Sequence, residues 1–214
     1  MAITRGDIFL WDELRKRDLI PPMPNVLEIG EANWFGDVDP PAGIICERMD
    51  DPFTLAKAYY RKVLNYKSIL AIDLQGKDAI KADLNQPINL PNQFDIVINS
   101  GTAEHVFNQA QVFKTVHDWT RTGGLMVHAV PVRGFFGHGL YNYNPVFFRL
   151  LAEANGYDIP LVFLFHFDRG IVAPQEKEPV YPPDENVMLY LAMVKKSDKP
   201  FVYPIQREYR TPGD

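Results

Sequence analysis

The chain has 214 residues, with 22 Lys and Arg against 27 Asp and Glu, and its formal charge of -5 disfavours a dedicated nucleic-acid binder. Hydrophobic residues make up 46% of the chain, which is typical of a globular domain and argues against intrinsic disorder. The single cysteine, Cys46, excludes an intrachain disulfide framework and a multi-thiolate metal site.

Charged residues at positions 12, 13 and 15 interrupt the apolar N-terminal stretch, so we expect no signal peptide. No apolar run approaches the ~20 residues that a membrane span needs. The sequence therefore predicts a cytoplasmic protein without a membrane span. The length of the chain predicts a single domain that spans residues 1–214. It consists of an N-terminal helical segment (1–22), a core (23–196) and an exposed C-terminal extension (197–214).

Hydrophobic patterning in the first half of the chain predicts two helices separated by short buried strands. Residues 31–52 are rich in proline and glycine and are expected to be irregular. The predicted elements, in chain order, are helix 7–20, strand 25–30, helix 53–65 and strands 68–74, 79–84 and 94–100.

The second half begins with a predicted helix over 103–121, whose apolar residues recur at spacings of three and four and which Gly123-Gly124 should end. A helix over 144–157 has Asn144 as its expected N-cap, with Pro145 in the first turn. The remaining predicted elements are strands 124–131, 159–167 and 185–196, with irregular connectors at 131–145 and 168–184.

Strands that alternate with helices predict an α/β fold with a mostly parallel sheet covered on both faces. The last two strands have no room for a packed helix between them, so we expect them to pair antiparallel. In such a sheet, ligands bind beyond the carboxyl ends of the strands. The residues that end the strands are therefore the first candidates for a site.

Acidic residues, amides and glycine end four of the predicted strands. Gly30 would let a ligand approach the backbone, and Asp73 could accept two hydrogen bonds from a ribose diol. Asp83 could accept one from an exocyclic amine or simply cap a turn. Structural alternatives stand beside these roles, because Glu28 could be a buried capping residue and Asp73 a turn acid.

Five segments carry a family pattern: VLEIG (26–30), AIDL (71–74), KADLNQP (81–87), FDIVINSGTAEHVFN (94–108) and GGLMVHAVP (123–131). In these segments the chain resembles the class I S-adenosylmethionine-dependent methyltransferases, over roughly residues 24–195. The most specific piece of the resemblance is FDIVINSGTAEHV. The resemblance implies a Rossmann-like three-layer α/β/α sandwich, with a seven-stranded, mostly parallel sheet whose last strand is antiparallel.

The resemblance implies S-adenosyl-L-methionine as the cofactor. Glu28 and Gly30 would lie under its methionine part, and Asp73 would take the ribose hydroxyls. Leu74, Asp83 and Leu84 would meet the adenine, and the residues that end strand 94–100 would lie beneath the sulfonium. The complete predicted cofactor set is Glu28, Gly30, Glu31, Asp73, Leu74, Asp83, Leu84, Asn99, Ser100 and Gly101.

The chain departs from the family in the loop after strand 25–30, where Ala32 and Trp34 replace further glycines. Segment 31–52 could form a lid over the cofactor. Alternatively, cofactor binding has decayed, and the protein is a non-catalytic binding protein on this fold. A nucleotide-dependent oxidoreductase is disfavoured, because its G-x-G-x-x-G fingerprint is missing around Gly30.

Two of the five histidines are placed to act as a base on an oxygen or nitrogen nucleophile. His105 follows strand 94–100, and His138 lies in the loop after strand 124–131. Each also has a structural alternative: His105 could form a hydrogen bond at the start of the helix, and His138 could hold its loop in place. His117, His128 and His166 are expected to be structural. No metal-ligand cluster with close spacing is visible, so no metal site is predicted.

The loop over 134–145 combines aromatic rings with neutral hydrogen-bonding groups, which suits a sugar, an aromatic ring or another polar small molecule. We therefore expect O- or N-methylation of a small-molecule or sugar-like acceptor. No Asn-Pro-Pro-Tyr-type motif follows strand 94–100, which disfavours methylation of nucleobase amines. The acceptor atom and the oligomeric state stay open. The predicted substrate residues are Trp34, Phe136, Tyr141, Asn142 and Tyr143.

Overall fold

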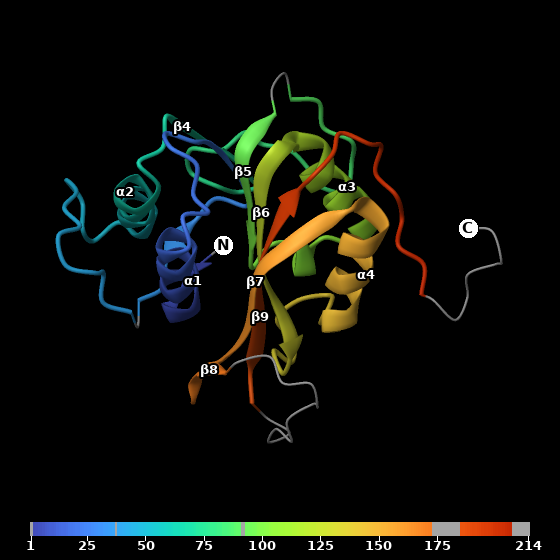
Figure 1. The fold of residues 1–214 in the computed structure, drawn as a ribbon. Helices are drawn as coiled ribbons and strands as arrows, with labels where there is room; N and C mark the ends of the chain where they lie inside the picture. Colours follow the sequence, from blue (N-terminus) through green and yellow to red (C-terminus); the bar gives the residue numbers. More distant parts are fainter. Residues whose placement is uncertain (1, 37, 91–92, 173–184, 207–214) are drawn as a thin grey trace.

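The computed structural model describes residues 2–36, 38–90, 93–172 and 185–206. A seven-stranded sheet with the strand order β4-β2-β5-β6-β9-β7-β8 lies between two layers of helices (Figure 1). The predicted α/β sandwich is therefore confirmed. The strands are β2 (Asn25–Ile29), β4 (Ser68–Ile72), β5 (Phe94–Ser100), β6 (Thr120–Arg133), β7 (Tyr157–His166), β8 (Gly170–Val172) and β9 (Val187–Lys195).

The first four strands of this order are mutually parallel, and β9 is antiparallel to both of its neighbours, β6 and β7. The expected antiparallel pairing of the last two predicted strands is confirmed. Within β5, Ile96 and Ile98 face one helical layer and Val97 faces the other, as the two-residue period of a strand requires. Both faces are thus buried, which explains the continuous apolar runs in the sequence.

Helices α1 (Arg5–Lys16) and α2 (Pro52–Leu64) pack on one face of the sheet, and α3 (Gln109–Trp119) and α4 (Pro145–Asn155) on the other. Asn144 caps α4 by accepting a hydrogen bond from the Val146 amide, as predicted. Gly156 ends this helix with a left-handed backbone, φ 67°. Local capping chemistry therefore sets the boundaries of α4.

The helix predicted over 103–121 is broken in the structure. A single 3-10 turn, η1 (Ala103–His105), comes first, and α3 begins only after Asn108, whose side chain accepts from the Gln111 amide. The turn is stabilised by Asn99, whose Oδ1 accepts from the Ala103 amide at 3.1 Å. The predicted end at Gly123-Gly124 is also wrong, because β6 already begins at Thr120.

The strand predicted over 79–84 is wrong, since it reduces to one bridge between Ile72 and Ile80. The chain after β4 is instead held in turns by side-chain carboxylates, including that of Asp83. The seventh strand is β8, within the connector that was expected to be irregular. The rest of that connector, 173–184, lies outside the described residues.

The N-terminal segment crosses the carboxyl end of the sheet. Strand β1 (Ala2–Ile3) pairs in parallel with β3 (Asn33–Trp34), and Thr4 caps α1 in a capping box with Asp7. The first helix consequently begins earlier than the predicted 7–20. This arrangement brings Thr4 next to Tyr190 of β9, and Asp7 next to Ser100 at the end of β5.

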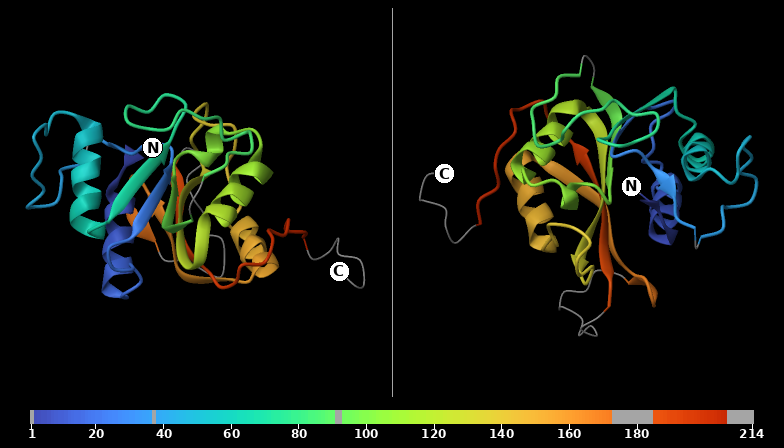
Figure 2. Two further views of the ribbon diagram at one scale, coloured as in Figure 1. Left: turned by 90° about the horizontal axis from the view of Figure 1, so that it is seen from above. Right: turned by 180° about the vertical axis from the view of Figure 1, so that it is seen from behind.

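The C-terminal segment 197–206 has mostly exposed side chains but is tied to α3 and α4, beside which it runs (Figure 2). Asn155 exchanges two hydrogen bonds with the Val202 backbone, and Phe201 packs against His117. The expected extension is therefore docked on the core through Lys199, Phe201 and Val202. None of the helices in the described ranges has both the length and the apolar character needed to cross a membrane.

Candidate active site

Two cavities open at the carboxyl ends of the parallel strands. The first cavity has a volume of about 390 Å³ and lies beyond β2, β4 and β5. The second cavity, of about 470 Å³, lies between the N-terminal segment, η1 and the loop after β6. Gly101 and His105 line both cavities, so the two spaces meet at the end of β5.

Residues from four separate segments converge on the first cavity, as expected from the strand ends. Gly30 has φ 90°, and a side chain there would collide with Thr102, so glycine is required. Sequence reasoning missed Asn85 and Thr102, although Asn85 directly follows the predicted pair at 83–84. The predicted cofactor residues that line this cavity are Gly30, Asp73, Leu74, Asp83, Leu84 and Gly101.

Asp73 organises the wall of the first cavity. Its Oδ1 accepts from the amides of Gln75 and Gly76, at 2.7 and 2.9 Å, and its Oδ2 accepts from the Glu31 amide at 2.9 Å. Partial burial alone would raise the pKa of Asp73, but these three amides outweigh it and lower the pKa below its ordinary value. A charged carboxylate is thus fixed at the end of β4, with one oxygen that accepts a single amide.

Asp83 and Asn85 form the opposite wall through a compact turn. Asp83 Oδ1 accepts from the backbone and side-chain nitrogens of Asn85, at 2.9 and 2.7 Å. Asn85 in turn accepts from the Asn108 amide at 2.9 Å, and its carbonyl accepts from Asn108 Nδ2 at 3.1 Å. This wall is therefore anchored to the start of α3.

Four predicted cofactor residues do not line the first cavity. The buried carboxylate of Glu31 accepts from the Asp78 amide and pairs with Lys57 at 3.1 Å, which ties the loop after β2 to α2. Asn99 points toward the α3 and α4 side of the sheet, where its Nδ2 lies 3.0 Å from His128 Nδ1. Glu28 and Ser100 point toward the α1 and α2 side of the sheet.

Glu28 is almost completely buried in the middle of the sheet. Burial, followed by the nearby Glu31 carboxylate, raises the pKa of Glu28 to about 8. Its Oε1 has no hydrogen-bond partner among the described residues. Glu28 is therefore mostly protonated at neutral pH, and it sits beneath the strand end rather than in the cavity wall.

Ser100 belongs to a buried network that fastens the N-terminal segment over the second cavity. Ser100 Oγ donates to Asp7 Oδ1 at 2.8 Å, and Thr4 Oγ1 donates to Asp7 Oδ2, also at 2.8 Å. Thr4 Oγ1 also lies 2.7 Å from the Tyr190 hydroxyl. Burial raises the pKa of Asp7, although these hydrogen bonds oppose the shift.

The second cavity combines aromatic walls with a polar end. Phe35, Phe135 and Phe167 contribute ring surfaces, and Phe135 and Phe167 pack edge to face at 5.7 Å. Glu104, His105 and His138 supply the polar end, next to the first cavity. The space thus offers a flat apolar surface beside three groups that can bind a proton or a metal ion.

The five predicted substrate residues line neither cavity. Trp34 packs on Tyr59 of α2 and donates to the Val38 carbonyl, so it leaves the first cavity open. Phe136 is fully exposed on its loop. The polar groups of the other three residues hold the loop in place. The Tyr141 hydroxyl donates to the Phe107 carbonyl, and Asn142 Nδ2 donates to the Gly134 carbonyl. The Tyr143 hydroxyl donates to Gln109 Oε1.

The structure brings together His105 and His138, the two histidines that the sequence offers as candidate bases. Their ring centroids are 4.8 Å apart, and both side chains are exposed to the second cavity. Burial of part of the ring, and then the neighbouring His138, lower the pKa of His105. His105 is therefore neutral near pH 7, with a ring nitrogen available as an acceptor.

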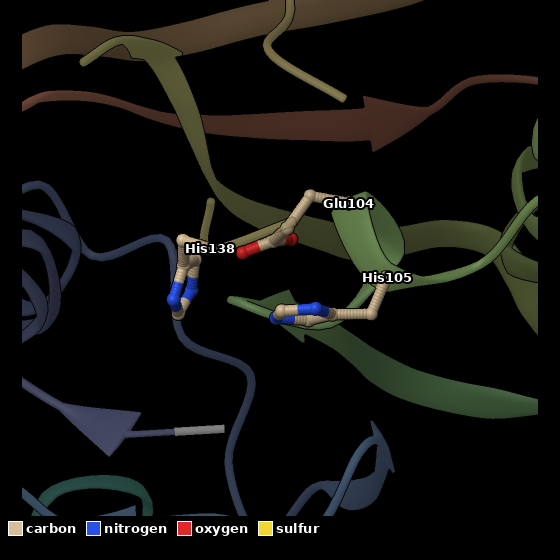
Figure 3. Close-up of side chains that lie close together, drawn as sticks. All are labelled: Glu104, His105 and His138. Atoms are coloured by element: carbon tan, nitrogen blue, oxygen red, sulfur yellow. The ribbon is translucent and has the colours of Figure 1, made fainter. Parts of the chain in front are cut away.

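Sequence reasoning missed Glu104, the third member of this group. Its side chain is 1% exposed, and burial raises its pKa to about 7. The side chains of Glu104, His105 and His138 point toward one another (Figure 3). One ligand atom from each lies within 4.8 Å of those of the others. The sequence shows no such cluster, because His138 comes from a distant loop that only the tertiary fold places beside η1.

No family model matches the chain, and no curated protein matches it in sequence. Solved structures do match. A Bacillus halodurans protein assigned to the methyltransferases without a stated substrate has a TM-score of 0.58 at 13% identity, over 87% of this chain and 99% of that one. A second match is a Burkholderia thailandensis 1,6-didemethyltoxoflavin-N1-methyltransferase, with 1,6-didemethyltoxoflavin and S-adenosylhomocysteine bound. Its TM-score is 0.53 at 12% identity, over 88% of this chain and 77% of that one.

The N-methyltransferase NodS from Bradyrhizobium japonicum, in complex with S-adenosylhomocysteine, has a TM-score of 0.52 at 14% identity, over 91% of this chain and 89% of that one. These likenesses cover 87%, 88% and 91% of this chain. They show that the chain has the fold of the class I methyltransferases.

Proposed function

We propose that this protein transfers a methyl group from S-adenosyl-L-methionine, bound in the first cavity, to an oxygen or nitrogen of a small-molecule acceptor in the second. The observation that carries the proposal is the junction of the two cavities at Gly101 and His105. A methyl donor and an acceptor bound on the two sides of this junction would face each other directly. Two structural neighbours that hold S-adenosylhomocysteine support the choice of cofactor.

The first cavity supplies the groups that this cofactor requires. Asp73 Oδ2 accepts one amide hydrogen bond, which leaves it a lone pair for a ribose hydroxyl. Asp83 and Asn85 offer polar contacts to the adenine, with Leu74 and Leu84 as apolar walls. The small Gly30 and Gly101 give the methionine part and the sulfonium close access to the backbone.

When bound, S-adenosylmethionine supplies a methyl group whose bond to sulfur breaks as the acceptor atom attacks, and the electron pair stays on sulfur. The contribution of the protein is positioning and exclusion of water. His105 lies at the junction and, being neutral, can accept the proton that the acceptor loses. His138 lies beside it, with ring centroids 4.8 Å apart, and orients the polar end of the acceptor.

The walls of the second cavity favour an acceptor with a flat face, such as an aromatic ring or the apolar face of a sugar. Phe35, Phe135 and Phe167 would pack on that face, while the attacking atom points to His105. One structural neighbour is an N1-methyltransferase with the small molecule 1,6-didemethyltoxoflavin bound. The net charge of -5 further supports a small-molecule substrate over nucleic acid, and a cytoplasmic setting is part of the proposal.

Calorimetric titration with S-adenosylhomocysteine tests this proposal. Asp73→Ala should weaken binding by about 1–3 kcal/mol, roughly 5- to 150-fold, because it removes a charge-assisted acceptor. Asp78→Ala is the matched control: its exposed carboxylate lies on the same loop but pairs with Lys57, so affinity should be retained.

Wild-type protein that binds neither S-adenosylmethionine nor S-adenosylhomocysteine at millimolar concentration would contradict the proposal. Binding of NADH in the same assay would favour the oxidoreductase alternative instead. Equal affinity of wild type and Asp73→Ala would place the cofactor elsewhere on the molecule. Circular dichroism of each variant verifies that the fold is intact.

A further inference from the structure

Glu104, His105 and His138 form a group with the composition of a metal site. Their ligand atoms lie within 4.8 Å of one another, at the polar end of the second cavity. Metal–nitrogen and metal–oxygen bonds of about 2.0–2.2 Å require these atoms to move slightly closer on binding. Both histidine side chains are exposed, so rotation of their rings can supply this movement.

The backbone holds the two segments of this group together. The Leu140 amide donates to the Glu104 carbonyl at 2.8 Å, and the His138 amide donates to the Phe135 carbonyl at 2.9 Å. Gly139 packs on Glu104, and a Cβ at this position would lie 3.0 Å from Glu104 Cγ. The His138 loop is therefore fixed against η1 before any ligand binds, as a preorganised site requires.

The Glu104 carboxylate is an independent sign of a missing ligand. Its side chain is 1% exposed, yet Oε2 has no hydrogen-bond partner among the described residues. The ring nitrogens of His105 and His138 likewise form no hydrogen bond within the described ranges, and both rings face the same space (Figure 3). A buried carboxyl oxygen without a partner is costly, and a bound cation would satisfy it.

We propose that Glu104, His105 and His138 bind a divalent first-row transition metal ion, with Zn²⁺ as the reference ion. Two imidazoles and one carboxylate suit Zn²⁺ or Fe²⁺, whereas Mg²⁺ and Ca²⁺ prefer sets composed of oxygen alone. Three protein ligands leave at least one position open. That position faces the second cavity, where a small molecule can enter.

Metal binding itself does not depend on the methyl-transfer proposal, but its role does. A metal ion at this position would bind the acceptor oxygen or nitrogen and lower its pKa. The acceptor would then lose its proton to water before it attacks the methyl carbon. His105 and His138 would act as ligands, and the ion would carry out the activation assigned above to His105.

Titration of untagged, chelator-treated protein with Zn²⁺ in a calorimeter tests the site, and Co²⁺ provides a visible absorption spectrum that reports coordination by nitrogen. We expect one ion per chain. Glu104→Gln and His138→Ala should each weaken Zn²⁺ binding by more than the ~10- to 100-fold that loss of an outer-shell partner costs. Glu47→Gln, an exposed acid in another loop, is the control and should bind normally.

Titration of the same variants with S-adenosylhomocysteine separates the two proposals. Glu104 and His138 line only the second cavity, so both variants should keep wild-type cofactor affinity, which also verifies folding. Zn²⁺ affinity that is equal in wild type, Glu104→Gln and His138→Ala would overturn the metal site, as would preference for Mg²⁺. Such a result would leave the methyl-transfer proposal unaffected. His138→Gln, on an exposed loop, repeats the test if Glu104→Gln fails to fold.

Discussion

At the scale of single residues, Glu28 is the carboxyl group that the fold perturbs most clearly. It lies in β2 between apolar residues, where burial and the neighbouring Glu31 raise its pKa to about 8. The unfolded chain would lose this proton near the ordinary value of 4.5, whereas the folded protein loses it only near pH 8. The contribution of Glu28 to stability is therefore complete below pH 4.5 and is lost progressively as the pH rises to about 8.

Glu28→Gln tests this pH dependence, because the amide has the same shape and cannot ionise. Each pH unit between the two pKa values costs the wild type ~1.4 kcal/mol. The variant should match the wild type, or fall slightly below it, near pH 4.5. It should become progressively more stable than the wild type toward pH 8. Chemical denaturation at a series of pH values measures the difference, and a difference that does not change with pH would contradict the assignment.

For some residues at the strand ends, but not for others, the sequence predicts whether the side chain lines the first cavity. Gly30, Asp73 and Gly101 line the first cavity as expected, because parallel strands bring their carboxyl ends to one edge. Asp83 also lines it, but from a turn and not from a strand end. The direction of Ser100 could not be predicted from the strand alone. Its partner, Asp7, is distant in sequence and reaches it only through the packing of α1.

At the scale of elements, the break between η1 and α3 creates the junction of the two cavities. A continuous helix over 103–121 would satisfy the hydrophobic spacing equally well. The turn at η1 instead directs Glu104 and His105 toward the second cavity, and Asn108 is the N-cap of a separate helix, α3. Gln109 Nε2 donates to the carbonyls of Ala103 and Val106 and so ties the start of α3 to the turn before it.

Asn108 is a helix cap that also anchors the cavity wall, whereas Asn144 is a cap alone. Asn108→Ala and Asn144→Ala should each lower the free energy of unfolding by about 1 kcal/mol. Only Asn108→Ala should also weaken binding of S-adenosylhomocysteine, roughly twofold to tenfold, because it loses the hydrogen bond to the Asn85 carbonyl. Denaturation and calorimetry measure the two effects, and equal affinities in both variants would show that this anchor does not support the site.

At the scale of the whole molecule, one sheet connects every part of the site. Helices α1 and α2 share its first face, α3 and α4 its second, and the N-terminal segment crosses its edge. Buried contacts run from residue 3 to residue 193 within these two layers. One domain over 1–214 stays a prediction, which the docking of residues 2–22 and of Lys199 to Val202 on the core supports.

A single domain should unfold in one thermal transition that the cofactor product shifts as a unit. At 100 times its dissociation constant, a ligand stabilises the folded state by about 2.7 kcal/mol. For a chain of this size, that corresponds to a rise in Tm of roughly 5–10 °C. Scanning calorimetry with and without S-adenosylhomocysteine measures both properties. Two transitions, of which only one shifts, would show that the chain has more than one folding unit.

The α/β class, the antiparallel last strands and the strand-end residues of the first cavity could be predicted from the amino-acid sequence. These features follow from local periodicity and from the fact that parallel strands end at a common edge. Long-range packing was needed to show that residues 79–84 form no strand and that β8 joins the sheet. It was also needed to show that Glu104 meets His138, and that the second cavity is lined by residues other than the five predicted. Contacts between distant segments depend on how whole layers pack, and no local pattern in the chain records them.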